Sequence, residues 1–245
     1  MPAEQPTFRG VFITGTDTGV GKTLVGAALA RFLKNRGLDV GVMKPAETGV
    51  DDPSGLGPDG ALLQWAAGSR DCSDLISPYR LRQPLAPAMA AKHDGVRIDL
   101  EHLLKSASQL ASNHDFLIVE GAGGLMVPLA GGYLMADLAA ALGLPVLVVA
   151  RPSLGTINHT LLTVFAARGM ELPLAGVIIN NMPAQPDAAE AEAPHAIGSL
   201  ASADLLGVFP RVEGDPQSQV EQLAEHLAGS ASLPWLCSAL AIDLP

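Results

Sequence analysis

The fold of this chain follows from its residues Gly10 to Thr23, GVFITGTDTGVGKT. A short apolar run, residues 11–13, leads into a glycine-rich turn that ends in Gly21-Lys22-Thr23, and helix-forming residues continue from Leu24 to Lys34. In this order a strand, a glycine-rich loop and a helix form a phosphate cradle, because free backbone N–H groups and the positive end of the helix dipole face the anion. Lys22 then reaches the β- and γ-phosphates, and the Thr23 hydroxyl faces Mg²⁺. The stretch therefore predicts a P-loop.

The spacing of this loop is irregular. Gly15 is followed by five residues before the Gly21-Lys22 pair, whereas the strict P-loop pattern has four, and Thr16 stands where that pattern has glycine. An ordinary glycine-rich strand-to-helix turn is the alternative. The strand and the helix on either side favour the nucleotide site.

Length and charge limit the class of protein. A chain of 245 residues with 48% hydrophobic content can bury a large core, and we expect one domain spanning residues 1–245. Its formal net charge of -10 argues against nucleic acid or an anionic membrane as a partner, because both are negatively charged. ATP stays possible, since its phosphates need only a local cationic site.

Cysteine usage and apolar runs indicate the compartment. Cys72 and Cys237 lie far apart without a metal-site or disulfide pattern, and we expect reduced thiols. The first ten residues contain no apolar signal core, and the most apolar run, Ala139–Ala150, is interrupted by Gly143 and Pro145. We therefore expect a soluble, cytoplasmic protein.

The rest of the chain alternates strand-like and helix-like segments. Expected strands cover residues 11–13, 39–43, 116–119, 145–149, 175–179 and 206–209, and expected helices cover 24–34, 59–67, 99–112, 156–168 and 218–228. Residues 45–58 and 71–94 are expected to be irregular because of their glycines and prolines, and 182–194 a loop or weak helix. The run 116–119 is apolar without alternation, which indicates a strand buried on both faces of a parallel sheet. The prediction is an α/β fold, a single doubly wound and mostly parallel sheet flanked by helices, of the P-loop NTPase type.

Polar residues follow several of the expected strands. Since the carboxyl ends of parallel strands share one edge, Thr16, Lys44, Glu120 and Asn180 should converge there. A carboxylate such as Glu120 at the end of an apolar strand requires a cation. Mg²⁺ prefers oxygen ligands with one or two carboxylates, and the expected set is Thr23, Asp59 and Glu120.

Two of these residues also have ordinary structural explanations. Lys44 could be a solvated cation at a strand end, and Asp59 could be the N-cap of the helix that it precedes. The six histidines show no metal-ligand spacing and are expected at the surface or the edge of the core.

Several motifs together resemble the dethiobiotin synthetase family, in the same order and at comparable spacings through nearly the whole chain. They are GTDTGVGKT at 15–23, Lys44-Pro45 with Thr48-Gly49, Asp59, VEGAGG at 119–124, LGTINH at 154–159, and Asn180. The chain departs from the family pattern at Gly19, where glutamate is frequent, at Thr48, where serine is usual, and after Asn180, where an aromatic residue of some members is missing between residues 187 and 196.

The resemblance implies an ATP-dependent ring closure in biotin synthesis. 7,8-Diaminopelargonate, CO₂ and ATP give dethiobiotin, ADP and phosphate through a carbamate and a carbamic-phosphoric anhydride, in a homodimer that uses Mg²⁺. It implies Lys22 and Lys44 as catalytic residues and Thr23, Asp59 and Glu120 as metal ligands. The implied ATP-binding residues are Gly19, Val20, Gly21, Lys22, Thr23, Leu24, Asp59, Glu120, Gly121, Ala122, Gly123, Asn180, Asn181, Pro210, Arg211, Val212 and Gln217. The implied substrate-binding residues are Thr16, Lys44, Thr48, Gly155, Thr156 and Asn158, the last three from the partner subunit.

Two other classes remain open at this point. A related P-loop amidoligase usually carries a glutaminase domain with a nucleophilic cysteine, for which this chain has neither room nor motif. A ParA- or MinD-like ATPase switch has an extra lysine early in the loop, where this chain reads Thr16-Asp17-Thr18.

Overall fold

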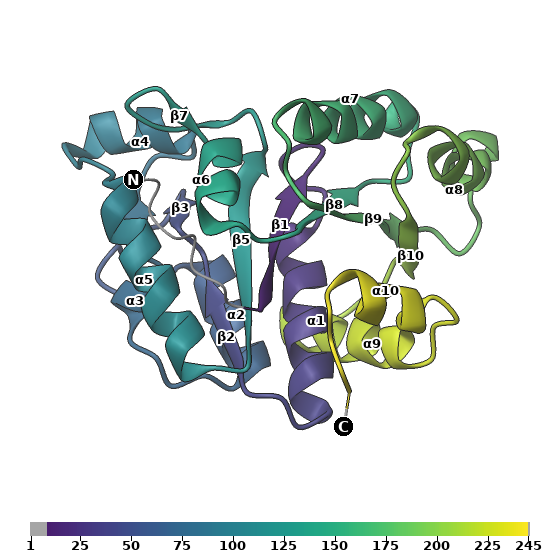
Figure 1. Cartoon of the computed structure of the whole chain (residues 1–245), viewed down its shortest axis with the longest axis horizontal. Helices are drawn as coiled ribbons and strands as arrows, with labels where there is room; N and C mark the ends of the chain where they lie inside the picture. The colour runs from purple at the N-terminus through teal and green to yellow at the C-terminus, as the bar shows by residue number, and fades with distance from the viewer. Residues whose placement is uncertain (1–8, 245) are drawn as a thin grey trace.

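A parallel sheet of six strands forms the centre of the computed structural model, which describes residues 9–244 (Figure 1). The strand order is β10-β9-β8-β1-β5-β2, and all neighbouring strands are parallel. These strands are β1 (Gly10–Gly15), β2 (Val40–Met43), β5 (Phe116–Gly124), β8 (Val146–Ala150), β9 (Leu174–Met182) and β10 (Leu205–Pro210). The predicted parallel sheet is confirmed. The expected absence of a signal core concerns mainly residues 1–8, which lie outside the described residues.

Strand β1 lies between β5 and β8, with Phe12 opposite Val119 on one side and Val146 on the other. From β1 the chain runs to β2 at the edge, returns to β5, and then continues to β8 beyond β1. Such a reversal of strand order opens a crevice at the carboxyl ends of the strands. The P-loop follows β1 at this point.

Helices cover both faces of the sheet, because β1 directs apolar side chains to each face. Successive side chains of a strand point to opposite faces, so Val11 and Ile13 belong to one buried cluster and Phe12 belongs to the other. The first face carries α1 (Lys22–Asn35), α2 (Pro58–Ala67), α9 (Pro216–Ala228) and α10 (Leu233–Ala239). The second carries α4 (Pro87–Asp94), α5 (Leu100–Asn113), α6 (Met135–Leu142), α7 (Thr156–Gly169) and α8 (Ala188–Leu200). The doubly wound arrangement is confirmed.

The two segments expected to be irregular contain short regular elements, so that part of the prediction is wrong. Strand β3 (Ala46–Thr48) pairs with β4 (Tyr79–Leu81), and α3 (Ser73–Ile76) lies between them in the chain. Pro87 is the first residue of α4. Proline loses no hydrogen bond at this position, because the first N–H of a helix has no partner within the helix. The elements α6, α10 and the hairpin of β6 (Pro128–Ala130) and β7 (Tyr133–Leu134) were also not expected.

Helix α8 is regular from Ala188 onward although Pro194 lies inside it. Asp187 and Glu190 form a capping box, in which each side chain accepts the other residue's backbone N–H. This cap accounts for a helix where a loop or weak helix was expected.

Among the described residues, no helix combines the length and the apolar character needed to cross a membrane.

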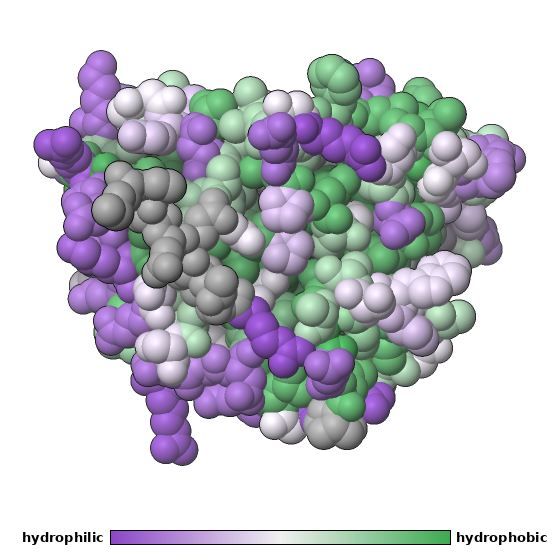
Figure 2. All heavy atoms as spheres, in the orientation of Figure 1, coloured by the Kyte–Doolittle hydropathy of each residue, from purple (hydrophilic) through white to green (hydrophobic). Residues whose placement is uncertain are grey.

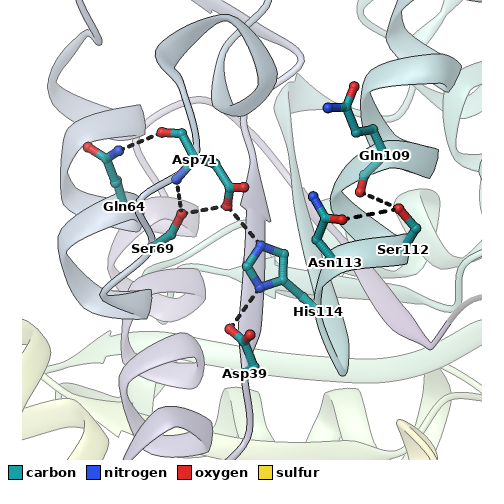
Figure 3. Close-up of polar contacts among 8 residues, drawn as sticks. All are labelled: Asp39, Gln64, Ser69, Asp71, Gln109, Ser112, Asn113 and His114. Atoms are coloured by element: carbon teal, nitrogen blue, oxygen red, sulfur yellow. Dashed lines mark hydrogen bonds and ion pairs between the residues drawn. The ribbon is translucent and has the colours of Figure 1, made fainter.

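A polar cluster around His114 joins three elements at the end of the sheet opposite the P-loop (Figure 3). His114 ends α5, and its Nδ1 and Nε2 lie 2.8 Å from Asp39 Oδ1, just before β2, and 2.8 Å from Asp71 Oδ2, after α2. The Ser69 hydroxyl donates to the same Asp71 oxygen at 2.6 Å. Burial opposes charging of the imidazole, but the hydrogen bonds and charges of the two aspartates outweigh it and raise the pKa of His114.

We expect the stability contributed by His114 to decrease as pH rises. When the pKa of a histidine is higher in the folded state than in the unfolded state, its full contribution to stability is present at pH values below the unfolded pKa of about 6.5. That contribution is lost as the pH rises through the folded-state pKa. His114→Ala should therefore lose about 1.5–3 kcal/mol of unfolding free energy at pH 6 and clearly less at pH 9. Urea unfolding at both pH values measures this, with the exposed His93→Ala as control. An equal loss at both pH values would contradict the charged bridge.

Candidate active site

A cavity of about 780 Å³ lies at the carboxyl ends of β1, β2 and β5, where the reversal of strand order opens the sheet. It contains most of the residues predicted to bind phosphates and metal. Its lining consists of Thr18, Gly19, Gly21, Lys22, Thr23, Leu24, Lys44, Ala46, Thr48, Asp59, Pro84, Leu85, Ala86, Pro87, Glu120, Ala122, Gly123 and Val127. Residues 84–87 and Val127 form a wall that the sequence did not predict.

The P-loop is held in place by its own backbone and by β9. Lys22 opens α1, is 6% exposed, and donates from Nζ to the Asp17 carbonyl at 3.2 Å. Asn180 Nδ2 donates to the carbonyl of Val20 at 3.1 Å. Gly21 has φ 90°, and a Cβ there would lie 2.1 Å from that amide nitrogen, so only glycine fits. Burial lowers the pKa of Lys22 in spite of the carboxylates nearby.

Lys44 lies between two carboxylates on the floor of the cavity. Its Nζ is 2.5 Å from Glu120 Oε1 and 2.8 Å from Asp59 Oδ2, and the Thr23 hydroxyl donates to the same Glu120 oxygen at 2.9 Å. Burial alone would lower the pKa of Lys44, but the charges of Glu120 and Asp59 raise it well above its usual range. The explanation of Lys44 as a solvated strand-end cation is wrong, since the residue is 4% exposed.

Asp59 lies in the first turn of α2 but does not cap it. The N-cap is Gly57 and the first helical residue is Pro58, so the alternative role as N-cap is wrong. Burial raises the pKa of Asp59, but the Lys44 ammonium outweighs it and holds that pKa below its usual value. The acceptor for the start of α2 is Glu47 of β3. Glu47 lies 12 residues before Asp59, so no local sequence pattern indicates this cap.

The oxygen atoms around Lys44 fit a magnesium ion. Glu120 Oε2 is buried and has no hydrogen-bond partner among the described residues. Residues 9–244 contain no group of three or more His, Cys, Asp or Glu side chains that could hold a metal by themselves. Two carboxylates, the Thr23 hydroxyl and phosphate oxygens form the ligand set that Mg²⁺ prefers.

The implied ATP-binding residues from Asn180 onward lie outside this cavity, at and beyond the ends of β9 and β10. The Arg211 Nε donates to Asn181 Oδ1 at 3.2 Å and its backbone N–H to the Met182 carbonyl at 2.7 Å, so the two strand ends are joined. Gln217 is exposed in the first turn of the adjacent α9. Pro210 ends β10 and Val212 is half-buried beyond it.

The residues predicted to bind substrate from a partner lie at the start of α7 and do not line this chain's cavity. Gly155 is the N-cap with φ 93°, and the Thr156 hydroxyl is buried and makes no hydrogen bond within the described residues. Thr156 therefore does not cap α7. Asn158 is exposed. Thr16 follows β1 and Gly121 belongs to β5, but neither residue lines the cavity.

An ion pair next to the P-loop has no local signal in the sequence. Arg151, directly after β8, lies with its guanidinium 3.4 Å from the Asp17 carboxylate. The two residues are 134 positions apart in the chain. Their proximity follows only from the pairing of β8 with β1.

The fold is shared with a MinD cell division protein and with a ParA family ATPase. MinD of Aquifex aeolicus aligns with a TM-score of 0.55 and 17% identity over 97% of this chain and 99% of its own. A ParA family ATPase from Chlorobium tepidum aligns with a TM-score of 0.55 and 18% identity over 96% and 100%. At these identities the likeness shows the P-loop NTPase fold alone.

Sequence comparison identifies the family. The family model described as AAA domain matches residues 9–215. The ATP-dependent dethiobiotin synthetase BioD of Anaeromyxobacter dehalogenans is 46% identical over 83% of this chain and 90% of its own length. The proteins of the same name from Thermodesulfovibrio yellowstonii and Bacillus subtilis are 44% and 43% identical, over 82% and 84% of this chain and 88% of their own lengths. With relatives of this identity along most of its length, and with the P-loop and its buried lysine–carboxylate cluster in place, the chain belongs to the ATP-dependent dethiobiotin synthetase family.

Proposed function

We propose that this chain catalyses the ATP- and Mg²⁺-dependent closure of the ureido ring of dethiobiotin from 7,8-diaminopelargonate and CO₂, with release of ADP and phosphate. The observation that carries the proposal is Lys44, a buried ammonium between Glu120 and Asp59 beside a P-loop. Family membership supports these substrates, and the cavity beside the P-loop offers room for them next to the expected phosphate site.

The chemistry requires stabilisation of negative charge. One amine of the diamine captures CO₂ as a carbamate, the γ-phosphoryl group of ATP moves to a carbamate oxygen, and the second amine attacks the resulting anhydride, releasing phosphate and closing the ring. Two anions meet in the transfer, so Lys22 on the phosphates and Lys44 on the carbamate would lower the barrier by fixed positive charge. Thr23, Asp59 and Glu120 would hold Mg²⁺, which neutralises charge on the phosphate oxygens.

The function is tested by ADP release from ATP·Mg²⁺ with bicarbonate, in the presence and absence of the diamine. The proposal requires ADP release that depends on the diamine. Release at the same rate without the diamine would instead favour an ATPase switch of the MinD or ParA kind, which shares this fold.

We further propose that Asn180 and Asn181 at the end of β9, with residues 210–212 and Gln217, form the site for the adenine ring. An amide offers the donor and acceptor pair that matches the edge of adenine. Within residues 9–244 the Asn180 side chain makes one hydrogen bond, from Nδ2 to the Val20 carbonyl. Asn180→Ala should reduce the preference for ATP over GTP in competition binding. A loss of affinity that is equal for both nucleotides would favour a purely structural role in holding the P-loop.

A homodimer is proposed from the surface of α7. Leu162 and Phe165, three positions apart on α7, are 58% and 76% exposed, and Leu154, just before the start of the helix, is 84% exposed. Figure 2 shows apolar surface over this helix, at the top right of the view. Contiguous exposed apolar side chains mark interaction sites, and a second copy of the chain would cover them.

The start of α7 would then bind the substrate carboxylate in the partner's cavity. The N–H groups and dipole of a helix start favour an anion, and Asn158 is exposed beside them. Phe165→Glu should dissociate the dimer in analytical ultracentrifugation, and Asn158→Ala should raise KM for the diamine more than for its carboxyl-methyl ester. A monomeric wild type, or equal KM changes for acid and ester, would contradict this arrangement.

The remaining parts of the proposal concern the whole chain. We propose that it acts as one domain, since both buried clusters pack on the same sheet. We place it in the cytoplasm, where ATP is available and the free thiols of Cys72 and Cys237 stay reduced.

A further inference from the structure

Helix α2 carries Asp59 in its first turn but has no capping side chain of its own. Its N-cap is Gly57, and its first residue is Pro58, which lacks an N–H. The next two N–H groups, those of Asp59 and Gly60, need acceptors from outside the helix. Glu47 provides both, because its Oε1 accepts from Asp59 at 2.7 Å and its Oε2 from Gly60 at 3.1 Å.

Glu47 lies behind the wall of the cavity and not in it. Side chains alternate along β3, so Ala46 and Thr48 line the cavity while Glu47, 3% exposed, points to the start of α2. This approach depends on two glycines at the start of α2, the N-cap Gly57 and Gly60 in the first turn. A Cβ at Gly57 would lie 2.3 Å from Glu47 Oε1, and one at Gly60 would lie 3.2 Å from Oε2.

The same short segment also carries Lys44, three positions before Glu47. Lys44 contacts the Asp59 side chain at 2.8 Å, and Glu47 holds the Asp59 backbone. Residues 44–47 therefore hold Asp59 at both its side chain and its main chain. Without Glu47 the Asp59 carboxylate would be held by its side chain alone and would move with the first turn of α2, for which the described residues provide no other side-chain cap.

We propose that Glu47 is a positioning residue that holds Asp59 in place for the metal ion, an inference that rests on the proposed function, in which Asp59 is a Mg²⁺ ligand. Groups that orient metal ligands typically change metal affinity by about 10- to 100-fold when removed. Glu47 does not itself line the cavity, and its hydrogen bonds go to the backbone of Asp59 and Gly60, so we expect its removal to act on the metal through Asp59.

The test is the affinity of Mn²⁺ for the ADP complex, measured by electron paramagnetic resonance of the free ion. Glu47→Ala should weaken Mn²⁺ binding about 10- to 100-fold, while ADP affinity without metal stays at the wild-type value. Glu47→Gln should fall between the wild type and Glu47→Ala, because its amide retains one acceptor oxygen for two N–H groups. The glutamine variant keeps the shape of the side chain, so it serves if the alanine variant does not fold.

A matched control separates positioning from a general loss of helix capping. Asp187 caps α8 by accepting from the Glu190 N–H at 2.9 Å, and that helix contributes no residue to the cavity. Asp187→Ala should lose thermal stability and keep wild-type Mn²⁺ affinity.

Asp59→Asn tests the underlying metal site. If this variant leaves Mn²⁺ affinity unchanged, the proposed metal site is wrong, and the positioning role of Glu47 is wrong with it. If Asp59→Asn weakens Mn²⁺ binding but both Glu47 variants do not, the metal site stands and the positioning role is overturned.

Discussion

Lys44→Ala is expected to lower kcat by about 100- to 1000-fold, the usual effect of removing one preorganised group that stabilises transition-state charge. The residue is buried, and the neighbouring carboxylates raise its pKa, so it carries a positive charge at neutral pH. That charge would act on the carbamate and the γ-phosphoryl oxygens, which become more negative during transfer. Steady-state kinetics with separate measurement of ATP affinity distinguishes this from a binding defect, because ATP affinity should change far less than kcat.

The same substitution has a cost in stability that must be separated from catalysis. Removing Lys44 leaves the fully buried Glu120 without its cation, and breaking such a pair costs about 3–5 kcal/mol. The double variant Lys44→Met with Glu120→Gln removes both charges and should recover much of the stability without recovering turnover. Lys105→Ala, which removes a lysine with an exposed partner, Glu101, is the surface control. Unchanged turnover in Lys44→Ala would exclude the proposed role.

Lys22→Ala is expected to weaken ATP binding by about 30-fold or more, which corresponds to the 2–5 kcal/mol typical for truncating one partner of a buried charged contact. Lys22 is nearly buried at the start of α1, with its ammonium directed back over the loop at the Asp17 carbonyl. Loss of this charge would remove the proposed contact to the phosphates in both the ground state and the transition state. Turnover should therefore disappear together with binding.

Calorimetric titration with ATP measures this effect directly. Lys34→Ala, on the last turn of the same helix, should bind ATP like the wild type. If Lys22→Ala binds ATP normally and loses only kcat, the division of roles between Lys22 and Lys44 would be wrong.

The parts of the molecule that the sequence predicted are those determined by local patterns. The apolar strand before the P-loop, the helix after it and the uninterrupted apolar run of β5 all lie where expected. Polar residues such as Lys44 and Glu120 meet because parallel strands end at one edge, which can be inferred from strand order alone.

The parts that were missed depend on contacts between distant segments. The cap of α2 comes from Glu47, and His114 joins residues 75 and 43 positions away, so no local pattern reveals either contact. Strands β3 and β4 are three residues each and are stabilised by pairing with each other, 33 positions apart at Ala46 and Tyr79. In such short elements tertiary contacts outweigh local propensity.

The central claim is tested most directly by following carbon from bicarbonate. Purified protein is incubated with ¹³C-bicarbonate, 7,8-diaminopelargonate and ATP·Mg²⁺, and the organic product is examined by ¹³C nuclear magnetic resonance beside a measurement of ADP. The account predicts a labelled ureido carbon that forms in equal amount with ADP and requires both the diamine and ATP. ADP formation without any labelled ureido carbon would contradict it.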